Sequence, residues 1–176
     1  MKIEDNFLDQ EKFDELQTLM MGKNFFWFYA DVIDYKGQKD RFMFYHMFQD
    51  VNMRMRQKNI FGRPTSAFYQ ILGPILNKIN LLALWRIKAN LLTRTPNIVE
   101  NEFHFDIGGI PEEKLKQWTT SIFYMNTNNG YTIFEDGAKV ESVANRMITF
   151  PSNMKHRGTS CTDEKTRVVI NFNYFK

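Results

Sequence analysis

The chain has 176 residues, of which 43% are hydrophobic and 15% aromatic, with 17 phenylalanines among them. A chain of this length and composition can bury a substantial core, which excludes an intrinsically disordered protein. Its 23 basic and 20 acidic residues leave a net charge of +3, too balanced to indicate a nucleic-acid partner by itself.

Cysteine content and hydropathy indicate the compartment. The chain has a single cysteine, Cys161, which excludes an intrachain disulfide. No apolar stretch approaches the roughly 20 residues of a membrane-spanning helix, and residues 1–5 lack the apolar core of a signal peptide. We therefore expect a cytoplasmic protein with no membrane association.

The first predicted elements are a helix and two strands. Asp9 is a suitable N-cap for a helix that runs to about Met21, and Gly22 is a suitable stop. Residues 24–29 and 41–48 are apolar on both faces, which predicts two buried strands. His46 lies within the second strand with no acidic residue at ligand spacing, so a core histidine is favoured over a metal ligand.

A second amphipathic helix is predicted over residues 65–80, where apolar residues recur at three- and four-residue steps. Gly73 and Pro74 should kink or split it, because proline removes a backbone donor. The preceding residues 52–63 are polar and basic. They form either a solvated loop or a mobile segment over the mouth of a substrate site, and their basic side chains are Arg54, Arg56, Lys58 and Arg63.

Residues 84–91 alternate between apolar and polar, which predicts a strand with Arg86, Lys88 and Asn90 on one face. Such a face ordinarily meets water. In a barrel-like fold it could instead line the internal cavity.

Short strands follow closely in the C-terminal half, at residues 119–126, 131–134, 139–143, 146–150 and 166–175, separated by turns rich in Asn, Asp and Gly. This order predicts a mainly β (α+β) fold, a double-stranded β-helix of the jelly-roll, cupin-like type, with two or three buttressing helices mostly from the N-terminal half. We expect one domain over residues 1–176. Residues 1–82 would supply the helical buttress and first strands, and residues 83–176 the β-helix core.

The residues with the clearest chemistry are His104 and Asp106. In an extended strand, side chains two positions apart point to the same side, so both can bind one ion. A histidine from a distant strand would complete two imidazoles and one carboxylate, the facial triad that suits Fe(II). The chain has only three histidines, and His156, in a turn after an apolar strand, is the predicted third ligand.

These residues resemble the Fe(II)- and 2-oxoglutarate-dependent dioxygenase superfamily, in particular its prolyl-4-hydroxylase-like branch and its small bacteriophage-encoded members. The resemblance covers most of the chain. It rests on the ordered set His104-x-Asp106, His156 and Arg167, together with Phe123-Tyr124-Met125-Asn126, Gly130-Tyr131-Thr132-Ile133-Phe134 and the opening Ile3-Glu4-Asp5-Asn6-Phe7-Leu8.

The resemblance implies a cosubstrate site. Fe(II) would bind two oxygens of 2-oxoglutarate and leave one position for O2, while ascorbate is a further candidate cofactor. Arg167 would hold the distal carboxylate, since a guanidinium offers a fixed fork of donors. Tyr124 would donate to the same carboxylate. Asn171 shares a face with Arg167 and is either a cosubstrate contact or an ordinary buried amide. Asn90 would be a further polar contact in the 2-oxoglutarate pocket, at about the position where many relatives have Tyr.

The implied activity is hydroxylation of an unactivated C–H bond with release of succinate and CO2, on a peptidyl proline or another protein side chain. Arg157 and Arg86 are candidate substrate-binding residues. The location would be the host cytoplasm if the chain is phage-encoded. Two alternatives stay open: an oxygenase acting on nucleic acid, which would use the basic residues 52–63, and a catalytically silent jelly-roll module that binds a metal.

Overall fold

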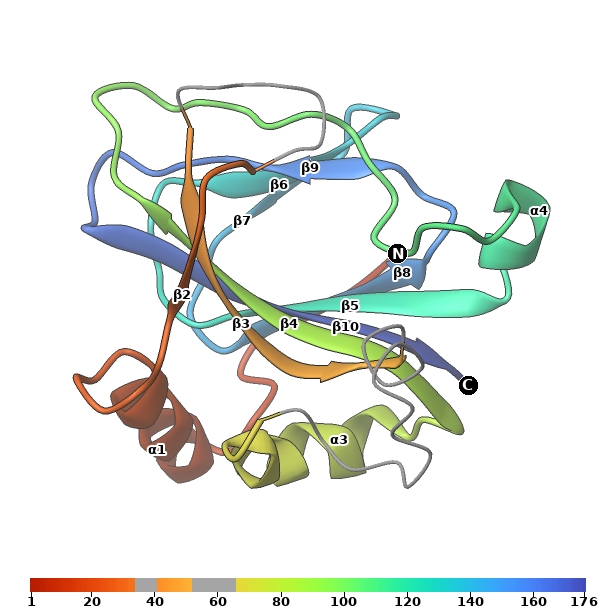
Figure 1. The fold of residues 1–176 in the computed structure, drawn as a ribbon, viewed down its shortest axis with the longest axis horizontal. Coiled ribbons are helices and arrows are strands. Elements are labelled where there is room, and N and C mark those ends of the chain that lie inside the picture. Colours follow the sequence, from red (N-terminus) through yellow and green to blue (C-terminus); the bar gives the residue numbers. More distant parts are fainter. Residues whose placement is uncertain (34–40, 52–65) are drawn as a thin grey trace.

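The computed structural model describes residues 1–33, 41–51 and 66–176. A large antiparallel sheet contains β1 (Lys2–Glu4), β2 (Phe28–Ala30), β3 (Met43–Asp50), β4 (Ala83–Thr93), β5 (Trp118–Tyr124), β8 (Arg146–Pro151) and β10 (Thr166–Phe175), in the order β1-β8-β5-β10-β4-β3-β2. A small sheet, in the order β7-β6-β9, contains β6 (Tyr131–Phe134), β7 (Lys139–Glu141) and β9 (His156–Gly158). The two sheets lie face to face (Figure 1). This arrangement is the predicted double-stranded β-helix.

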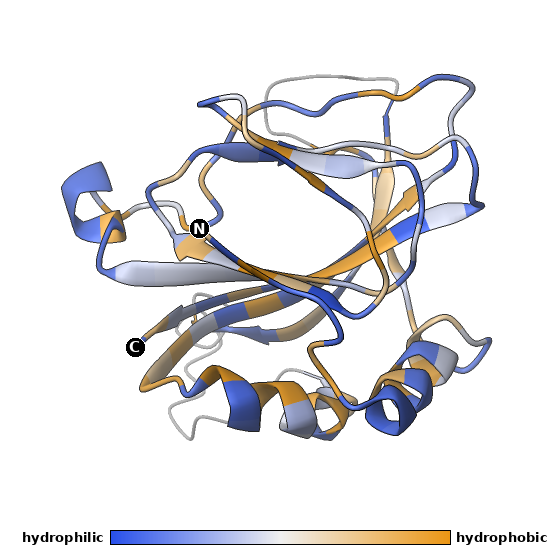
Figure 2. Ribbon diagram, turned by 180° about the vertical axis from the view of Figure 1, so that it is seen from behind, coloured by the Kyte–Doolittle hydropathy of each residue, from blue (hydrophilic) through white to orange (hydrophobic). Residues whose placement is uncertain are grey.

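The helices α1 (Gln10–Met20) and α3 (Gly73–Ile79) cover the outer face of the large sheet (Figure 1). Both carry hydrophilic as well as hydrophobic residues, as Figure 2 shows. On α1, the apolar spacing of Phe13, Leu16 and Met20 puts all three side chains in the core. The rings of Phe7 and Phe13 both pack edge-on against Phe123 of β5, so the start of the chain is fixed to the sheet.

The predicted second helix is split as expected. Residues Tyr69–Leu72 form a 3-10 turn, η1, and α3 follows with Pro74 in its first turn, where the missing N–H is not needed. Asn80 ends α3 in a left-handed conformation.

Strand β10 is the centre of the large sheet and pairs with β4 on one side and β5 on the other. Its residues alternate between two cores. Ile170 and Phe172 face the helices, whereas Val169 faces the small sheet together with Ile122 and Phe134. Arg167 and Asn171 share the face of Val169, so the alternation directs both into the space between the sheets.

Some local predictions were wrong. Residues 24–27 are not a strand, and β2 begins only at Phe28. The short helix α4 (Glu112–Leu115) forms where no helix was predicted. The segment 103–106 is not a regular strand, because it joins the small sheet through a single bridge between His104 and His156. The turn predicted around His156 is instead the start of β9.

Candidate metal centre

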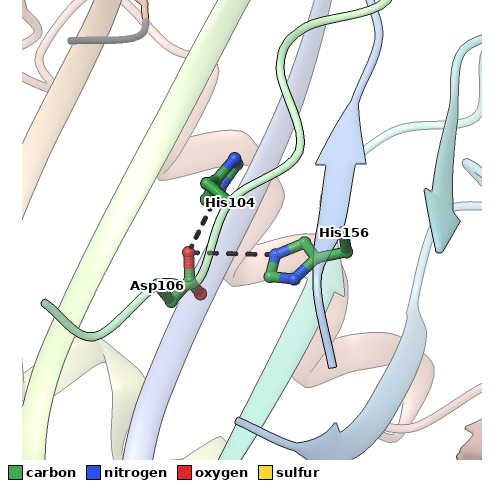
Figure 3. Close-up of side chains that lie close together, drawn as sticks. All are labelled: His104, Asp106 and His156. Atoms are coloured by element: carbon green, nitrogen blue, oxygen red, sulfur yellow. Dashed lines mark ion pairs between the residues drawn. The ribbon is translucent and has the colours of Figure 1, made fainter. Parts of the chain in front are cut away.

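His104, Asp106 and His156 lie together between the two sheets (Figure 3). Their ligand atoms all lie within 4.8 Å of one another, and no other such group of three is found in residues 1–33, 41–51 and 66–176. Asp106 Oδ1 is 3.6 Å from His104 Nε2 and 3.8 Å from His156 Nε2. Two backbone hydrogen bonds between the two histidines, of 3.0 and 3.2 Å, fix the spacing of the segments that carry them.

Each imidazole is oriented by its other nitrogen. His104 Nδ1 lies 3.0 Å from the carbonyl of Glu102, and His156 Nδ1 lies 3.3 Å from that of Met154. Carbonyls only accept, so each Nδ1 carries the proton and each Nε2 presents a lone pair to the centre.

The donor set fits a metal ion. His156 Nε2 is buried and has no hydrogen-bond partner among the described residues, a state that costs free energy unless an electrophile binds there. Burial lowers the pKa of His156 below its ordinary value of 6.5, which favours the neutral ring that a ligand needs. Two neutral imidazoles and one carboxylate oxygen are the donor set of non-haem Fe(II) sites.

The carboxylate of Asp106 is held by three further side chains. Its Oδ2 accepts hydrogen bonds from Asn171 Nδ2 and Asn173 Nδ2, both at 3.1 Å. Arg86 NH2 lies 3.5 Å from Oδ1. Burial acts to raise the pKa of Asp106, but the contacts with His104, His156 and Arg86 outweigh it and hold this pKa well below 3.8. Asp106 is therefore ionised in the folded chain and can bind a cation.

Arg167 is buried in the same space, only 3% exposed. Its Nε donates to Ser142 Oγ at 2.8 Å and its NH2 to Thr132 Oγ1 at 3.1 Å. Thr132 Oγ1 also accepts from Tyr124 OH at 2.9 Å. Among the described residues, no carboxylate lies within ion-pair distance of this guanidinium.

Two glycines make room for the guanidinium. A Cβ atom at Gly158 would lie 3.2 Å from Arg167 NH1, and one at Gly130 would lie 2.7 Å from Arg167 Cδ. Any other residue at Gly130 would also come within 2.6 Å of the Ser160 carbonyl oxygen.

One cavity of about 740 Å³ connects the metal ligands with Arg167. Its apolar wall includes Leu92, Ile122 and Val169. Its charged and polar lining from β4 consists of Arg86, Lys88 and Asn90, the face that alternates in the sequence. The side of β4 that ordinarily would meet water thus lines the cavity.

The remaining candidate residues are placed as follows. Tyr124 is fully buried behind Thr132, and burial raises its pKa. Asn171 donates to Asp106, while its Oδ1 has no partner in the described part of the chain. Asn90 lines the cavity with its Oδ1 also unpartnered there. Arg157 is not part of the cavity lining; it forms an ion pair with Glu100 and lies over the ring of Phe103.

His46 is a core histidine, as predicted, with Nδ1 2.6 Å from the Phe26 carbonyl and Nε2 2.7 Å from Ser66 Oγ. The basic residues Arg54, Arg56, Lys58 and Arg63, and with them the predicted lid over 52–63, lie outside the described residues.

Sequence reasoning did not assign Ser142, Asn173 or the contact of Arg86 with Asp106. Asn173 could have been found, because it lies two residues after Asn171 on the face that already carries Arg167. Ser142 directly follows β7 and reaches Arg167 only because the two sheets pack face to face, for which the sequence has no signal.

No protein-family model and no curated protein matches this sequence. Solved structures do match. A 2OG-Fe(II) oxygenase-family oxidoreductase from Burkholderia pseudomallei superposes with a TM-score of 0.61 at 10% identity, covering 97% of this chain and 82% of that one. A prolyl hydroxylase from Trichoplax adhaerens, in complex with a hypoxia inducible factor peptide fragment, gives 0.58 at 12% identity over 99% and 82% of the two chains. The viral collagen prolyl hydroxylase of Paramecium Bursaria Chlorella virus-1 gives 0.53 at 14% identity over 99% and 95%.

This chain has the 2-oxoglutarate oxygenase fold. The double-stranded β-helix predicted from the order of the strands is therefore confirmed. Within the 2-oxoglutarate oxygenase fold, the triad and Arg167 lie in one cavity between the two sheets. None of the helices in the described ranges has the length and apolar character of a membrane span.

Proposed function

We propose that this chain is an Fe(II)- and 2-oxoglutarate-dependent dioxygenase that hydroxylates an unactivated C–H bond and releases succinate and CO2. The observation that supports it most is Arg167. A buried guanidinium with no carboxylate partner in the described chain carries a large desolvation cost, which an anionic ligand would offset. A site that only held a structural metal would need no such cation, so a catalytically silent module is disfavoured.

The proposed roles follow from the contacts. His104, Asp106 and His156 would hold Fe(II), which when bound supplies the redox chemistry that O2 activation requires. The guanidinium of Arg167 would bind the distal carboxylate of 2-oxoglutarate. Thr132 Oγ1 already accepts two hydrogen bonds, from Tyr124 and Arg167, so its own proton is free to be donated to the same carboxylate. Tyr124 would then act through Thr132.

The apolar wall of the cavity would exclude water from the reacting groups. Because Arg167 lies at the buried end, the substrate would enter from the side of Arg86, and Arg86 is the better candidate for a substrate contact than Arg157.

We propose a peptidyl side chain, such as proline, as the substrate. Two of the structural neighbours are prolyl hydroxylases, one of them bound to a peptide, and this is what supports the choice. O2 as cosubstrate, ascorbate as auxiliary reductant, a cytoplasmic location and a bacteriophage origin remain predictions from the sequence.

The cosubstrate role is tested by calorimetric titration of 2-oxoglutarate into the Mn(II)-loaded protein, comparing the parent with Arg167→Met. Loss of a buried, hydrogen-bonded charge pair typically costs 2 to 5 kcal/mol, so the affinity should fall about 30-fold or more. Mn(II) binding should stay, since Arg167 contacts none of the three metal ligands in the structure.

Arg157→Met is the matched control, because it makes the same change at an arginine outside the cavity lining. It should bind 2-oxoglutarate like the parent. Equal affinity of the Arg167→Met variant and the parent would overturn the assignment.

A further inference from the structure

The second oxygen of Asp106 is held away from the metal centre by two amides. Oδ1 is the oxygen that lies near both imidazoles, at 3.6 and 3.8 Å from their Nε2 atoms. Oδ2 accepts from Asn171 Nδ2 and Asn173 Nδ2, each at 3.1 Å, and Asn171 Nδ2 reaches Oδ1 only at the longer distance of 3.4 Å. All three side chains are less than a tenth exposed, so water does not compete with these bonds.

Both polar atoms of the Asn173 side-chain amide have further partners. Its Oδ1 accepts from Arg86 Nε at 3.2 Å, and its Nδ2 also lies 3.1 Å from Thr120 Oγ1. Since its carbonyl oxygen faces a guanidinium, the amide cannot flip without placing NH2 groups against Arg86. The orientation that donates to Asp106 is thus set by the neighbouring strand β4.

We infer that Asn171 and Asn173 are positioning residues that limit Asp106 to one metal-binding oxygen. This inference rests on the proposed function, and it explains why two buried amides make their shorter hydrogen bonds to the same carboxylate oxygen. A carboxylate binds metals through one or both oxygens. Two imidazoles and one oxygen leave three positions of an octahedron open, whereas a carboxylate that used both oxygens would leave only two. A cosubstrate that chelates through two atoms, with O2 beside it, needs all three.

The inference predicts different effects of removing the amides on metal binding and on cosubstrate binding. If the amides are removed, Oδ2 loses its donors and becomes free to turn toward the ion. The metal should then bind about as well as before, within roughly threefold, because the lost hydrogen bonds are replaced by a second carboxylate contact. A chelating cosubstrate whose far carboxylate is held by Arg167 cannot choose freely among the open positions, so it would have to displace Oδ2. It should therefore bind less well, by about tenfold or more, which corresponds to about 1.4 kcal/mol.

The test uses the full chain with Co(II), whose visible absorption reports its coordination, and N-oxalylglycine, an inert analogue of 2-oxoglutarate. Titrations with Co(II) and then with N-oxalylglycine are compared for the parent, Asn171→Leu, Asn173→Leu and the double variant. Each single variant keeps one amide on Oδ2, so the double variant should lose more affinity for N-oxalylglycine than the two single losses combined. Its Co(II) spectrum before addition of the analogue should also differ from that of the parent.

Ser121→Ala is the control, since this buried hydroxyl on β5 contacts Thr149 and Tyr174 and does not line the cavity, and it should behave like the parent. If the double variant does not fold, Asn173→Leu alone should show the same pattern with a smaller shift.

Three results would contradict the account. Unchanged N-oxalylglycine affinity in the variants would show that the amides do not limit the carboxylate. Loss of Co(II) binding would show that the two amides serve only to hold Asp106 where it can bind the metal. A parent protein whose Co(II) spectrum does not respond to N-oxalylglycine would contradict the proposed function itself.

Discussion

The guanidinium of Arg167 lines the cavity but is closely packed on the side that faces Gly158. Gly158 lies on β9, two residues after the metal ligand His156, and its missing side chain leaves room for Arg167 NH1. The same short strand therefore carries the metal ligand His156 and packs through Gly158 against the guanidinium of Arg167.

We predict that Gly158→Ala weakens 2-oxoglutarate binding while leaving metal binding intact. The new methyl group would lie 3.2 Å from NH1, so the guanidinium would have to shift by a few tenths of an ångström from the position in which it meets the carboxylate. A displacement that breaks one charge-assisted hydrogen bond typically costs about 1.5 to 3 kcal/mol, or about 10- to 100-fold in affinity. Calorimetry with the Mn(II)-loaded variant measures it, and an affinity equal to that of the parent would show that the guanidinium has room to move.

For single residues, the sequence predicts well which side chains bind the metal and the cosubstrate. It predicts poorly which side chains hydrogen-bond to them. His104, Asp106 and Arg167 could be chosen because their residue types have few alternatives for this chemistry. The contact of Arg86 with Asp106 could not be chosen, because it depends on the register that places β4 beside β10. A hydrogen bond between strands far apart in the chain cannot be predicted from the spacing of nearby residues in the sequence.

Among the elements, β5 is the strand of the large sheet whose Phe123 packs against the N-terminal segment and α1. This ring is fully buried and takes edge contacts from both Phe7 and Phe13. The alternation of β5 and β10 was predictable from the sequence, whereas the short strand β9 was not, since its three residues follow a turn and carry no apolar pattern.

We predict that Phe123→Ala lowers the free energy of unfolding by about 3 to 5 kcal/mol, the usual cost of deleting a buried phenyl ring. Phe26→Ala is the matched control, because that ring is 65% exposed, and its cost should stay below about 1 kcal/mol. Urea unfolding followed by circular dichroism measures both. If both substitutions lowered the free energy of unfolding by similar amounts, the proposed role of Phe123 in packing the helices against the sheet would be contradicted.

For the whole molecule, two buried histidines govern the response to acid. Burial lowers the pKa of both His46 and His156 below 6.5, so both are neutral in the folded chain. The unfolded chain takes up protons near pH 6.5 and therefore binds more of them than the folded chain once the pH falls below that value. The pKa of Asp106, held below 3.8, adds a further loss of stability only at still lower pH.

The metal-free protein should thus lose stability as the pH is lowered from 7.5 to 5.5. Urea unfolding at the two pH values measures the change, and the double variant His46→Gln, His156→Gln should show a smaller one. A parent whose stability is constant or rises over this range would contradict the burial of neutral imidazoles.

The central claim is that the three metal ligands and Arg167 form one site for Fe(II) and 2-oxoglutarate. Anaerobic titration with both, followed by visible absorption, tests it most directly. The account predicts a weak metal-to-ligand charge-transfer band in the parent that is lost in His104→Ala and in Asp106→Ala. A parent without this band, or a band that survives both substitutions, would contradict it.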